Sequence, residues 1–306
     1  MNILINTLKN RKYDYDYLYN HPKTIKILNN DKCDINVIIG VKGRKKYLDS
    51  TIKYLIKSIN KYNVSITVVE IDTESNNIDI CEKYGINYIF VPIDIINTEN
   101  LYSRALSFNI GYLFTLNSNY YLFHDCDILV DDNFFKILFE NYINDNFKWL
   151  QTFTGKRLKM LGMTVSNHIL DGDIVDLKNV KDFIYAKPGA AGGSTLVKSE
   201  IFNEVGGFDP EIFYGYAPED SLFFTKLCCL ERKIDNIISC HQCDNIHYAD
   251  NPPIELYHIN HPPTINENKF YAQMMYCHNT YWSFNYDDKL EYIKIKKDFL
   301  SKYLKK

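Results

Sequence analysis

The chain has 306 residues, of which 46% are hydrophobic and 15% are aromatic, including 25 Tyr and 18 Phe. This is a globular composition, and the length suffices for a substantial core in one large domain or two smaller ones. The formal net charge of −3 supplies no basic excess to neutralise phosphates. The charge therefore excludes a nucleic-acid binder that works through bulk electrostatics.

The sequence also indicates where the protein resides. It contains no run of about eighteen apolar residues, so we expect no membrane span. Residues 1–19 mix polar and charged residues with short apolar pieces and lack the continuous apolar core of a signal peptide. The eight cysteines are scattered, which is typical of reduced thiols. These features predict a soluble, cytoplasmic protein.

The first firm element follows a polar, weakly patterned stretch, residues 1–34, which we interpret as an N-terminal extension. Residues 35–39 are a β-branched run and predict a buried parallel strand, and residues 45–59 carry apolar side chains at helical spacing. Val41, Lys42 and Arg44 lie in the corner between them. Open α/β folds bind ligands at such corners, so Lys42 and Arg44 either contact a phosphate or a base or are simply solvated.

Strands and helices then alternate. Residues 66–71 predict a second strand that ends at Asp72, which either binds a base or ribose or is an ordinary turn residue. A third strand follows at 86–91, and residues 101–116 predict a helix with Arg104 and Asn109 off its apolar face. This alternation, which continues to about residue 147, indicates a doubly wound α/β sheet.

The strand before residue 130 carries the most informative pattern. Four apolar or aromatic residues at 120–123 run into Asp125 and Asp127, whose i, i+2 spacing points both carboxylates to one side at the end of a buried strand. Two carboxylates this close repel one another unless a cation lies beside them. Oxygen ligands suit Mn²⁺ or Mg²⁺. The alternative is an aspartate-rich turn.

Two later segments add candidates. Residues 151–186 show no clear period, so they either line a second substrate's pocket or form an inserted strand pair. Residues 189–197 are small and include Gly193, which lets the backbone pass close to a neighbour. An aromatic loop then leads to Glu219 and Asp220 at the start of a helix. This acid pair either caps the helix or holds a sugar ring over a base.

The C-terminal third offers metal ligands and a helix. His258 and His261 follow a plausible short strand, and one of them could complete the ligand set of the metal. Cys240 and Cys243, with a histidine nearby, are either a zinc site or ordinary thiols. Residues 287–306 predict an amphipathic helix with its lysines facing outward.

Taken together, these stretches resemble the metal-dependent type A glycosyltransferases, which have the nucleotide-diphospho-sugar transferase fold. The likeness is strongest to the β-1,4-galactosyltransferase C-terminal region and the chondroitin-polymerase-like enzymes. It covers roughly residues 35–262 and depends on four motifs in the family's order, at residues 37–44, 103–111, 125–127 and 192–220. The resemblance implies an α/β fold with a mostly parallel central sheet flanked by helices, in one large domain at residues 35–306.

The resemblance also implies roles for individual residues. Asp127 and Asp125 would bind Mn²⁺ (or Mg²⁺), with His258 or His261 as a further ligand. Asp220 would be the general base for the acceptor hydroxyl, and Glu219 would orient the acceptor. The implied donor-binding residues are Val41, Lys42, Arg44, Asp72, Arg104, Asn109, Asp125, Gly193 and Tyr216.

The implied reaction moves a sugar from a UDP-sugar donor to a hydroxyl of a saccharide or glycoconjugate acceptor, with inversion. One alternative is a retaining transferase of the polypeptide N-acetylgalactosaminyltransferase type, and another is a non-catalytic carbohydrate-binding module on the same scaffold. A sugar-nucleotide pyrophosphorylase would need a glycine- and basic-rich loop after the first strand. Gly43 alone does not make such a loop.

Overall fold

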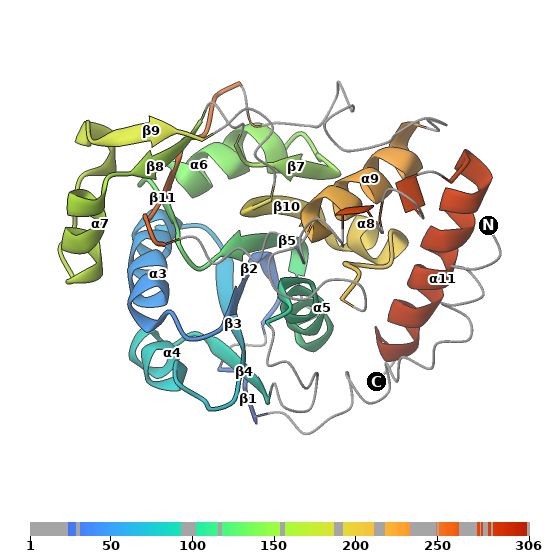
Figure 1. The fold of residues 1–306 in the computed structure, drawn as a ribbon, viewed down its shortest axis with the longest axis horizontal. Helices are drawn as coiled ribbons and strands as arrows, with labels where there is room; N and C mark the ends of the chain where they lie inside the picture. The colour runs from blue at the N-terminus through green and yellow to red at the C-terminus, as the bar shows by residue number, and fades with distance from the viewer. Residues whose placement is uncertain are drawn as a thin grey trace.

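Figure 1 shows the fold in a computed structural model. The structure describes residues 24–28, 31–92, 102–115, 118–153, 157–186, 192–210, 218–232, 249, 251–262, 274–275, 277, 281–282 and 284–304. Its core is a seven-stranded sheet with the order β1 (Thr24–Lys26), β4 (Asn87–Pro92), β3 (Val64–Asp72), β2 (Cys33–Val41), β5 (Ser118–Asp125), β10 (Ser194–Lys198) and β7 (Trp149–Gln151).

The four central strands, β4, β3, β2 and β5, are parallel to one another, whereas β1 and β10 run antiparallel to their neighbours. The predicted α/β fold with a mostly parallel central sheet is therefore confirmed. Thr24–Lys26, in the predicted N-terminal extension, form the edge strand β1 beside β4.

Helices cover both faces of this sheet (Figure 1). Val37 and Ile39 pack with apolar residues of α3 (Lys45–Ile59) and α4 (Ile78–Tyr84), whereas Ile38 packs on the other side with α5 (Arg104–Phe114). Successive side chains of a strand point to opposite faces, so a strand buried on both faces is an unbroken apolar run. A Cβ atom on Gly111 would lie 2.5 Å from Ile38, which shows how closely α5 approaches β2.

A second, four-stranded sheet lies at the upper left of Figure 1. Its order is β6 (Ile128–Val130), β11 (Leu256–His258), β8 (Leu158–Leu161) and β9 (Phe183–Tyr185). The antiparallel pairing of β8 with β9 confirms the strand pair that was one reading of residues 151–186, and α7 (Met163–Leu170) connects the two strands. The chain enters this sheet from β5 through β6, after which come α6 (Phe134–Leu138) and a π-helical turn at Phe139–Ile143.

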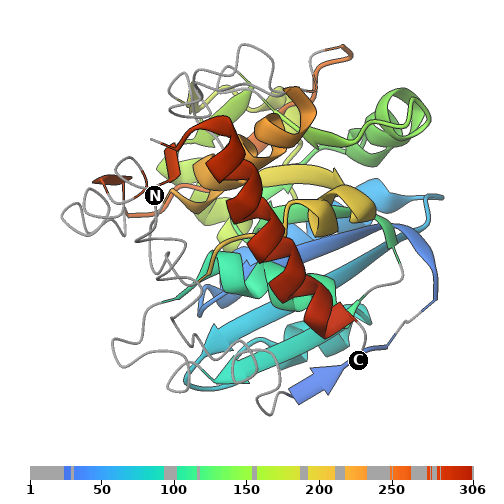
Figure 2. The same cartoon turned by 90° about the vertical axis from the view of Figure 1, so that its right-hand side faces the viewer.

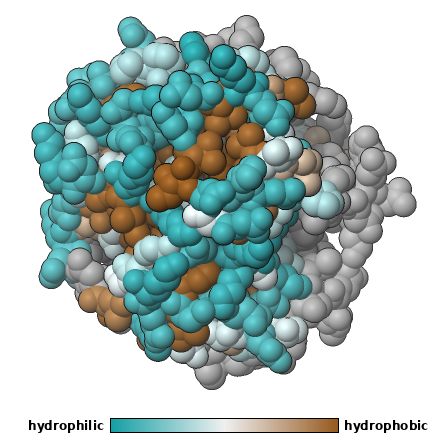
Figure 3. All heavy atoms as spheres, turned by 90° about the vertical axis from the view of Figure 1, so that its left-hand side faces the viewer, coloured by the Kyte–Doolittle hydropathy of each residue, from teal (hydrophilic) through white to brown (hydrophobic). Residues whose placement is uncertain are grey.

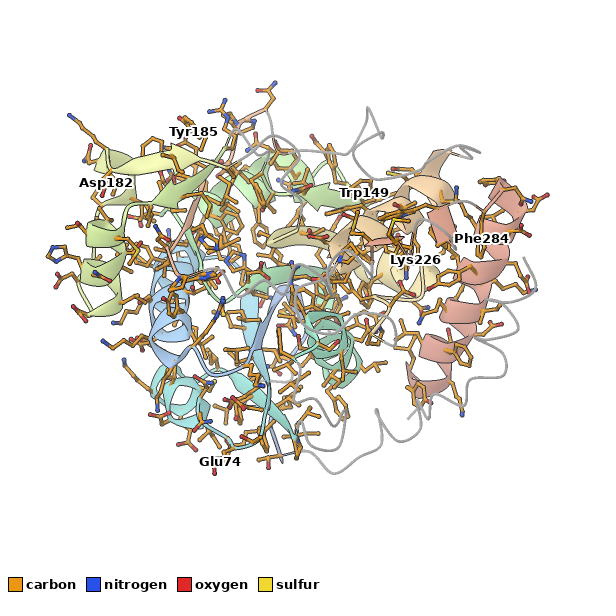
Figure 4. The ribbon with its side chains drawn as sticks, viewed as in Figure 1. Glu74, Trp149, Asp182, Tyr185, Lys226 and Phe284 are labelled. Atoms are coloured by element: carbon orange, nitrogen blue, oxygen red, sulfur yellow. The ribbon has the colours of Figure 1, made fainter. Side chains whose placement is uncertain are left out.

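The C-terminal helix α11 (Tyr286–Leu304) crosses α8 (Ser199–Glu204) and α9 (Glu219–Arg232), as Figure 2 shows. The expectation that its lysines face outward is wrong for Lys289 and Lys296, which are buried. Lys296 Nζ lies 3.3 Å from Asp209 Oδ1, and Lys226 Nζ of α9 lies 2.7 Å from Asp209 Oδ2. Figure 4 shows Lys226 on the side of α9 that faces α11. The buried carboxylate of Asp209 thus compensates the charge of Lys296, which amphipathic spacing alone would place in solvent.

The face that carries α7 and β9 is drawn in Figure 3, where hydrophobic side chains are visible among hydrophilic ones. Large apolar side chains that are exposed in this region are Met163, Ile174, Ile184 and Tyr185. Within the described ranges, none of the helices combines the length and the apolar character that a bilayer crossing requires.

Candidate active site

The candidate site is built around the turn that joins β5 to β6. Asp125 is the last residue of β5, and its backbone N–H donates to the carbonyl of Gly193 at 2.8 Å. Asp127 lies two residues further on, and its carbonyl accepts from the N–H of Ile259 at 2.9 Å. Backbone hydrogen bonds therefore fix both aspartates between β10 and the end of β11.

His124, the residue before Asp125, stabilises the same turn from inside the core. Its ring accepts from the Ser194 hydroxyl through Nδ1 at 2.9 Å and donates through Nε2 to the carbonyl of Ile128 at 3.0 Å. Its side chain is fully buried, and this burial lowers the pKa of His124 to about 4. At neutral pH the imidazole is therefore neutral, and its two hydrogen bonds connect Ser194 of β10 to Ile128 of β6 across the turn.

Asp127 lies beside two histidines, because β11 pairs antiparallel with β6 and sets His258 opposite Ile128. His258 Nε2 is 3.7 Å from Asp127 Oδ1, and His261 Nε2 is 3.2 Å from Asp127 Oδ2. Arg44 also contacts Asp127, through Nη1 to Oδ2. Burial acts to raise the pKa of Asp127, but the hydrogen bond from His261 and the nearby positive charges outweigh it and lower the pKa to about 2.

The chemistry of this group fits a divalent cation. Asp127, His258 and His261 each offer one ligand atom, and these atoms lie within 4.8 Å of one another. His261 Nδ1 donates to the carbonyl of Pro262 at 2.9 Å, which leaves Nε2 as the ligand atom, a common arrangement in metal sites. His258 Nδ1 is buried without a hydrogen-bond partner among the described residues. Both histidines of the sequence prediction thus lie at Asp127.

Asp125 faces a different cation, Arg104. Arg104 Nε lies 2.7 Å from Asp125 Oδ1, its Nη1 lies 2.8 Å from Glu219 Oε1, and the same Nη1 lies 3.8 Å from Asp220 Oδ2. Glu219 and Asp220 form the first turn of α9, where the helix dipole favours acidic side chains. One guanidinium thus connects the aspartate of the turn to the acid pair predicted to act on the acceptor.

Three carboxylates around one guanidinium leave this cluster short of positive charge. Burial, more than any other cause, raises the pKa of Glu219 to about 8 and that of Asp125 to about 6, although Arg104 opposes both shifts. These groups titrate as a set, so the cluster of acids holds a proton more readily than isolated carboxylates would.

Two glycines let the chain pass beside these acids. Gly192 and Gly193 have φ of +80° and +77°, the region that L side chains rarely adopt. A Cβ atom on Gly192 would lie 2.2 Å from Asp220 Oδ2, and one on Gly193 would lie 2.6 Å from Ile128 Cδ1 and 3.6 Å from Asp125 Oδ2. The backbone at Gly192 and Gly193 therefore approaches its neighbours closely, as predicted. These neighbours include the carboxylates of Asp220 and Asp125.

Comparison with solved structures identifies the architecture. TarS from S. aureus is similar over 89% of this chain and 43% of TarS, at 15% identity and a TM-score of 0.52. TarS 1–349 in complex with UDP-GlcNAc is similar over 89% of this chain and 71% of that one, at 15% identity and a TM-score of 0.50. The chain has the type A glycosyltransferase fold. This chain spans less than half of the longer TarS structure.

A third similar structure is the catalytic domain of Drosophila β1,4-galactosyltransferase 7 in complex with xylobiose. It matches over 78% of each chain, at 14% identity and a TM-score of 0.45. No protein-family model matches the sequence, and no curated protein matches it.

On the type A scaffold, the corner after β2 lies at the predicted edge of the sheet. Gly43 N–H donates to Asp72 Oδ2 at 2.9 Å, and Thr73 N–H donates to Asp72 Oδ1 at 2.7 Å. Asp72 thus stabilises the corner itself, as the turn-residue reading anticipated. Val41 is buried in the core, and its donor contact stays a prediction. Donor contacts by Lys42 and Asp72 stay predictions.

Asn109 has a structural partner in this fold. Its amide donates to the carbonyl of Phe208 at 3.0 Å, and its carbonyl oxygen accepts from the N–H of Phe208 at 2.9 Å. The side chain is buried, so it positions the segment before α9. A donor contact of Asn109 stays a prediction. Tyr216, Cys240 and Cys243 lie outside the described residues.

Two features of the site are not predicted from the sequence. They are the pairing of Arg104 with acids, where a contact to the donor is expected, and the structural role of His124. A histidine inside an otherwise apolar strand, directly before Asp125, was the available signal, because a buried imidazole requires hydrogen-bond partners. The partners of Arg104 come from distant segments and leave no local signal.

Proposed function

We propose that this chain is a metal-dependent glycosyltransferase that moves a sugar from a UDP-sugar to a hydroxyl of a saccharide or glycoconjugate, with inversion at the anomeric carbon. The observation that carries the proposal is that one side chain, Arg104, contacts both Asp125 and Glu219. It means that the metal-ligand group at Asp127 and the acid pair of α9 flank the same turn. A donor's diphosphate and an acceptor's hydroxyl would meet between them.

The cation would be Mn²⁺ or Mg²⁺, held by Asp127 with His258 and His261, and by Asp125 in the predicted set. When bound, it supplies Lewis-acid stabilisation of the negative charge on the departing diphosphate. The structure of TarS 1–349 in complex with UDP-GlcNAc supports a UDP-sugar as the donor.

Asp220 is the proposed general base. Its carboxylate accepts from the Ser221 N–H at 2.6 Å and is partly exposed, so an acceptor can reach it. It takes the proton of the acceptor hydroxyl while the oxygen bonds to the anomeric carbon, and the bond from that carbon to the diphosphate breaks to release UDP. Glu219 is more deeply buried, is held by Arg104 and orients the acceptor.

The test is a screen of UDP-sugars with saccharide acceptors, in which release of UDP is measured with Mn²⁺ and with a chelator. We expect Mn²⁺-dependent release with at least one donor. Asp220→Asn should abolish transfer and keep UDP binding, because it removes the base and leaves the metal group intact. Asp132→Asn is the matched control, since Asp132 is an exposed acid that pairs with Lys57. Full activity of Asp220→Asn would refute the assigned base.

A further inference from the structure

Arg44 lies at the start of α3, where the chain leaves the corner after β2. Its backbone has a φ of 50°, and its carbonyl accepts from Leu48 N–H at 3.0 Å, so the main chain is anchored in the first turn of the helix. The side chain extends from there across the edge of the sheet to the carboxylate of Asp127. Its guanidinium carbon lies 5.9 Å from the centre of the Tyr47 ring.

The guanidinium contacts the same oxygen that the metal-ligand group uses. Arg44 Nη1 and His261 Nε2 both lie against Asp127 Oδ2, the latter at 3.2 Å. A divalent cation on this oxygen would lie next to the positive charge of Arg44, and Asp125, the other carboxylate of the turn, is paired with Arg104 at 2.7 Å. Like charges at such separations repel strongly where solvent is partly excluded, and Asp127 is buried.

We infer that Arg44 is an exchangeable cation. It neutralises Asp127 in the metal-free protein, is displaced when the metal binds, and then pairs with the diphosphate of the donor. This inference rests on the proposed function and adds that loading of the metal and capture of the nucleotide are coupled through one side chain.

The surroundings of Arg44 suit this exchange. Its side chain is 30% exposed, whereas that of Asp127 is 6% exposed, so the arginine is the partner with room to move. The anchored backbone keeps the guanidinium at the carboxyl edge of the sheet, where open α/β folds bind their ligands. Arginine also binds phosphate through two parallel N–H groups, so a diphosphate can replace the carboxylate as its partner.

The experiment measures Mn²⁺ binding to the full chain, by the electron paramagnetic resonance signal of free Mn²⁺, and then UDP binding by calorimetry at saturating Mn²⁺. Arg44→Gln should bind Mn²⁺ roughly tenfold more tightly than the wild-type protein, because a competing cation is gone. The same variant should bind UDP roughly tenfold more weakly, because a phosphate partner is gone. A gain in Mn²⁺ affinity together with a loss of UDP affinity is the result that exchange predicts.

Two variants serve as controls. Arg44→Lys keeps the positive charge and should bind Mn²⁺ at least about threefold more weakly than Arg44→Gln. Lys46→Gln removes the same charge from the same helix, at an exposed residue that pairs with Asp171. Lys46→Gln should leave both affinities unchanged.

Mn²⁺ affinity in Arg44→Gln that equals or falls below the wild-type value would overturn the exchange. Tighter Mn²⁺ binding with unchanged UDP affinity would overturn it as well, because the released arginine would then not reach the nucleotide. If neither the wild-type protein nor any variant bound Mn²⁺, the proposed function would fail together with this inference. Wild-type binding of Mn²⁺ with no effect of Arg44→Gln would remove the inference alone.

Discussion

Arg104 Nη1 and Glu219 Oε1 lie 2.8 Å apart, although 115 residues separate them in the chain. The same arginine holds Asp125 at 2.7 Å, so its charge is shared between the turn after β5 and the first turn of α9. The two halves of the proposed active site therefore depend on one side chain.

Arg104→Gln should lower kcat by about a hundredfold, because Glu219 and Asp125 lose the group that fixes their positions. Removal of one partner from a buried ion pair should also lower the free energy of unfolding by about 3 kcal/mol. Steady-state kinetics and denaturant unfolding measure the two effects. Arg157→Gln is the control, because Arg157 forms a partly exposed pair with Glu255 at 3.6 Å. Its substitution should lower the free energy of unfolding by less than about 1 kcal/mol. Equal losses in both variants would argue against a special role for Arg104.

Gly192→Ala separates backbone strain from damage to the acid pair. A Cβ atom here would lie 2.2 Å from Asp220 Oδ2, whereas at Gly85, with φ of +62°, nothing lies within 4 Å. Gly192→Ala and the control Gly85→Ala should each lower the free energy of unfolding by about 1 kcal/mol, because alanine is strained at positive φ. Only Gly192→Ala should reduce transfer, by roughly tenfold or more, since it displaces the carboxylate of the base. Equal activity in the two variants would show that Gly192 does not set the position of Asp220.

His124 predicts a pH dependence of stability. The folded protein holds this histidine neutral, with its pKa lowered from 6.5 to about 4, so between these values the unfolded chain binds a proton that the folded protein does not. Stability from this residue is therefore complete above pH 6.5 and is lost as the pH falls toward 4, by about 3 kcal/mol in total. Urea unfolding from pH 7 to 4 measures it. The free energy of unfolding should fall less steeply with decreasing pH in His124→Gln than in the wild-type protein. An unchanged pH dependence would show that His124 titrates normally.

Much of the fold follows from local patterns in the sequence. The apolar runs at Val37–Ile39 and before Asp125 predict strands because each strand is buried on both faces, and the helical spacing at residues 45–59 matches α3. The small residues at 189–197 predict close packing, and the structure contains it at Gly192 and Gly193. These signals are local, because they depend only on which faces of an element are buried.

The pairing of charges could not be predicted in the same way. The sequence treats Asp125 and Asp127 as equivalent, yet the structure pairs Asp125 with Arg104 and Asp127 with Arg44 and two histidines. The order of the strands and the entry of β11 beside β6 decide these partners. The buried Lys296 has the same origin, since its partner Asp209 lies 87 residues away in sequence. Electrostatic partners are a tertiary property, so spacing does not encode them.

The central claim is that a cation at Asp127 holds the diphosphate of a nucleotide, and titration of the full chain with UDP by calorimetry tests it most directly. We expect UDP to bind in the presence of Mn²⁺, and its affinity to fall by roughly a hundredfold or more in a chelator or in Asp127→Ala. The control Asp132→Ala should bind like the wild-type protein. UDP affinity that is the same with and without Mn²⁺, or that survives Asp127→Ala unchanged, would contradict the account.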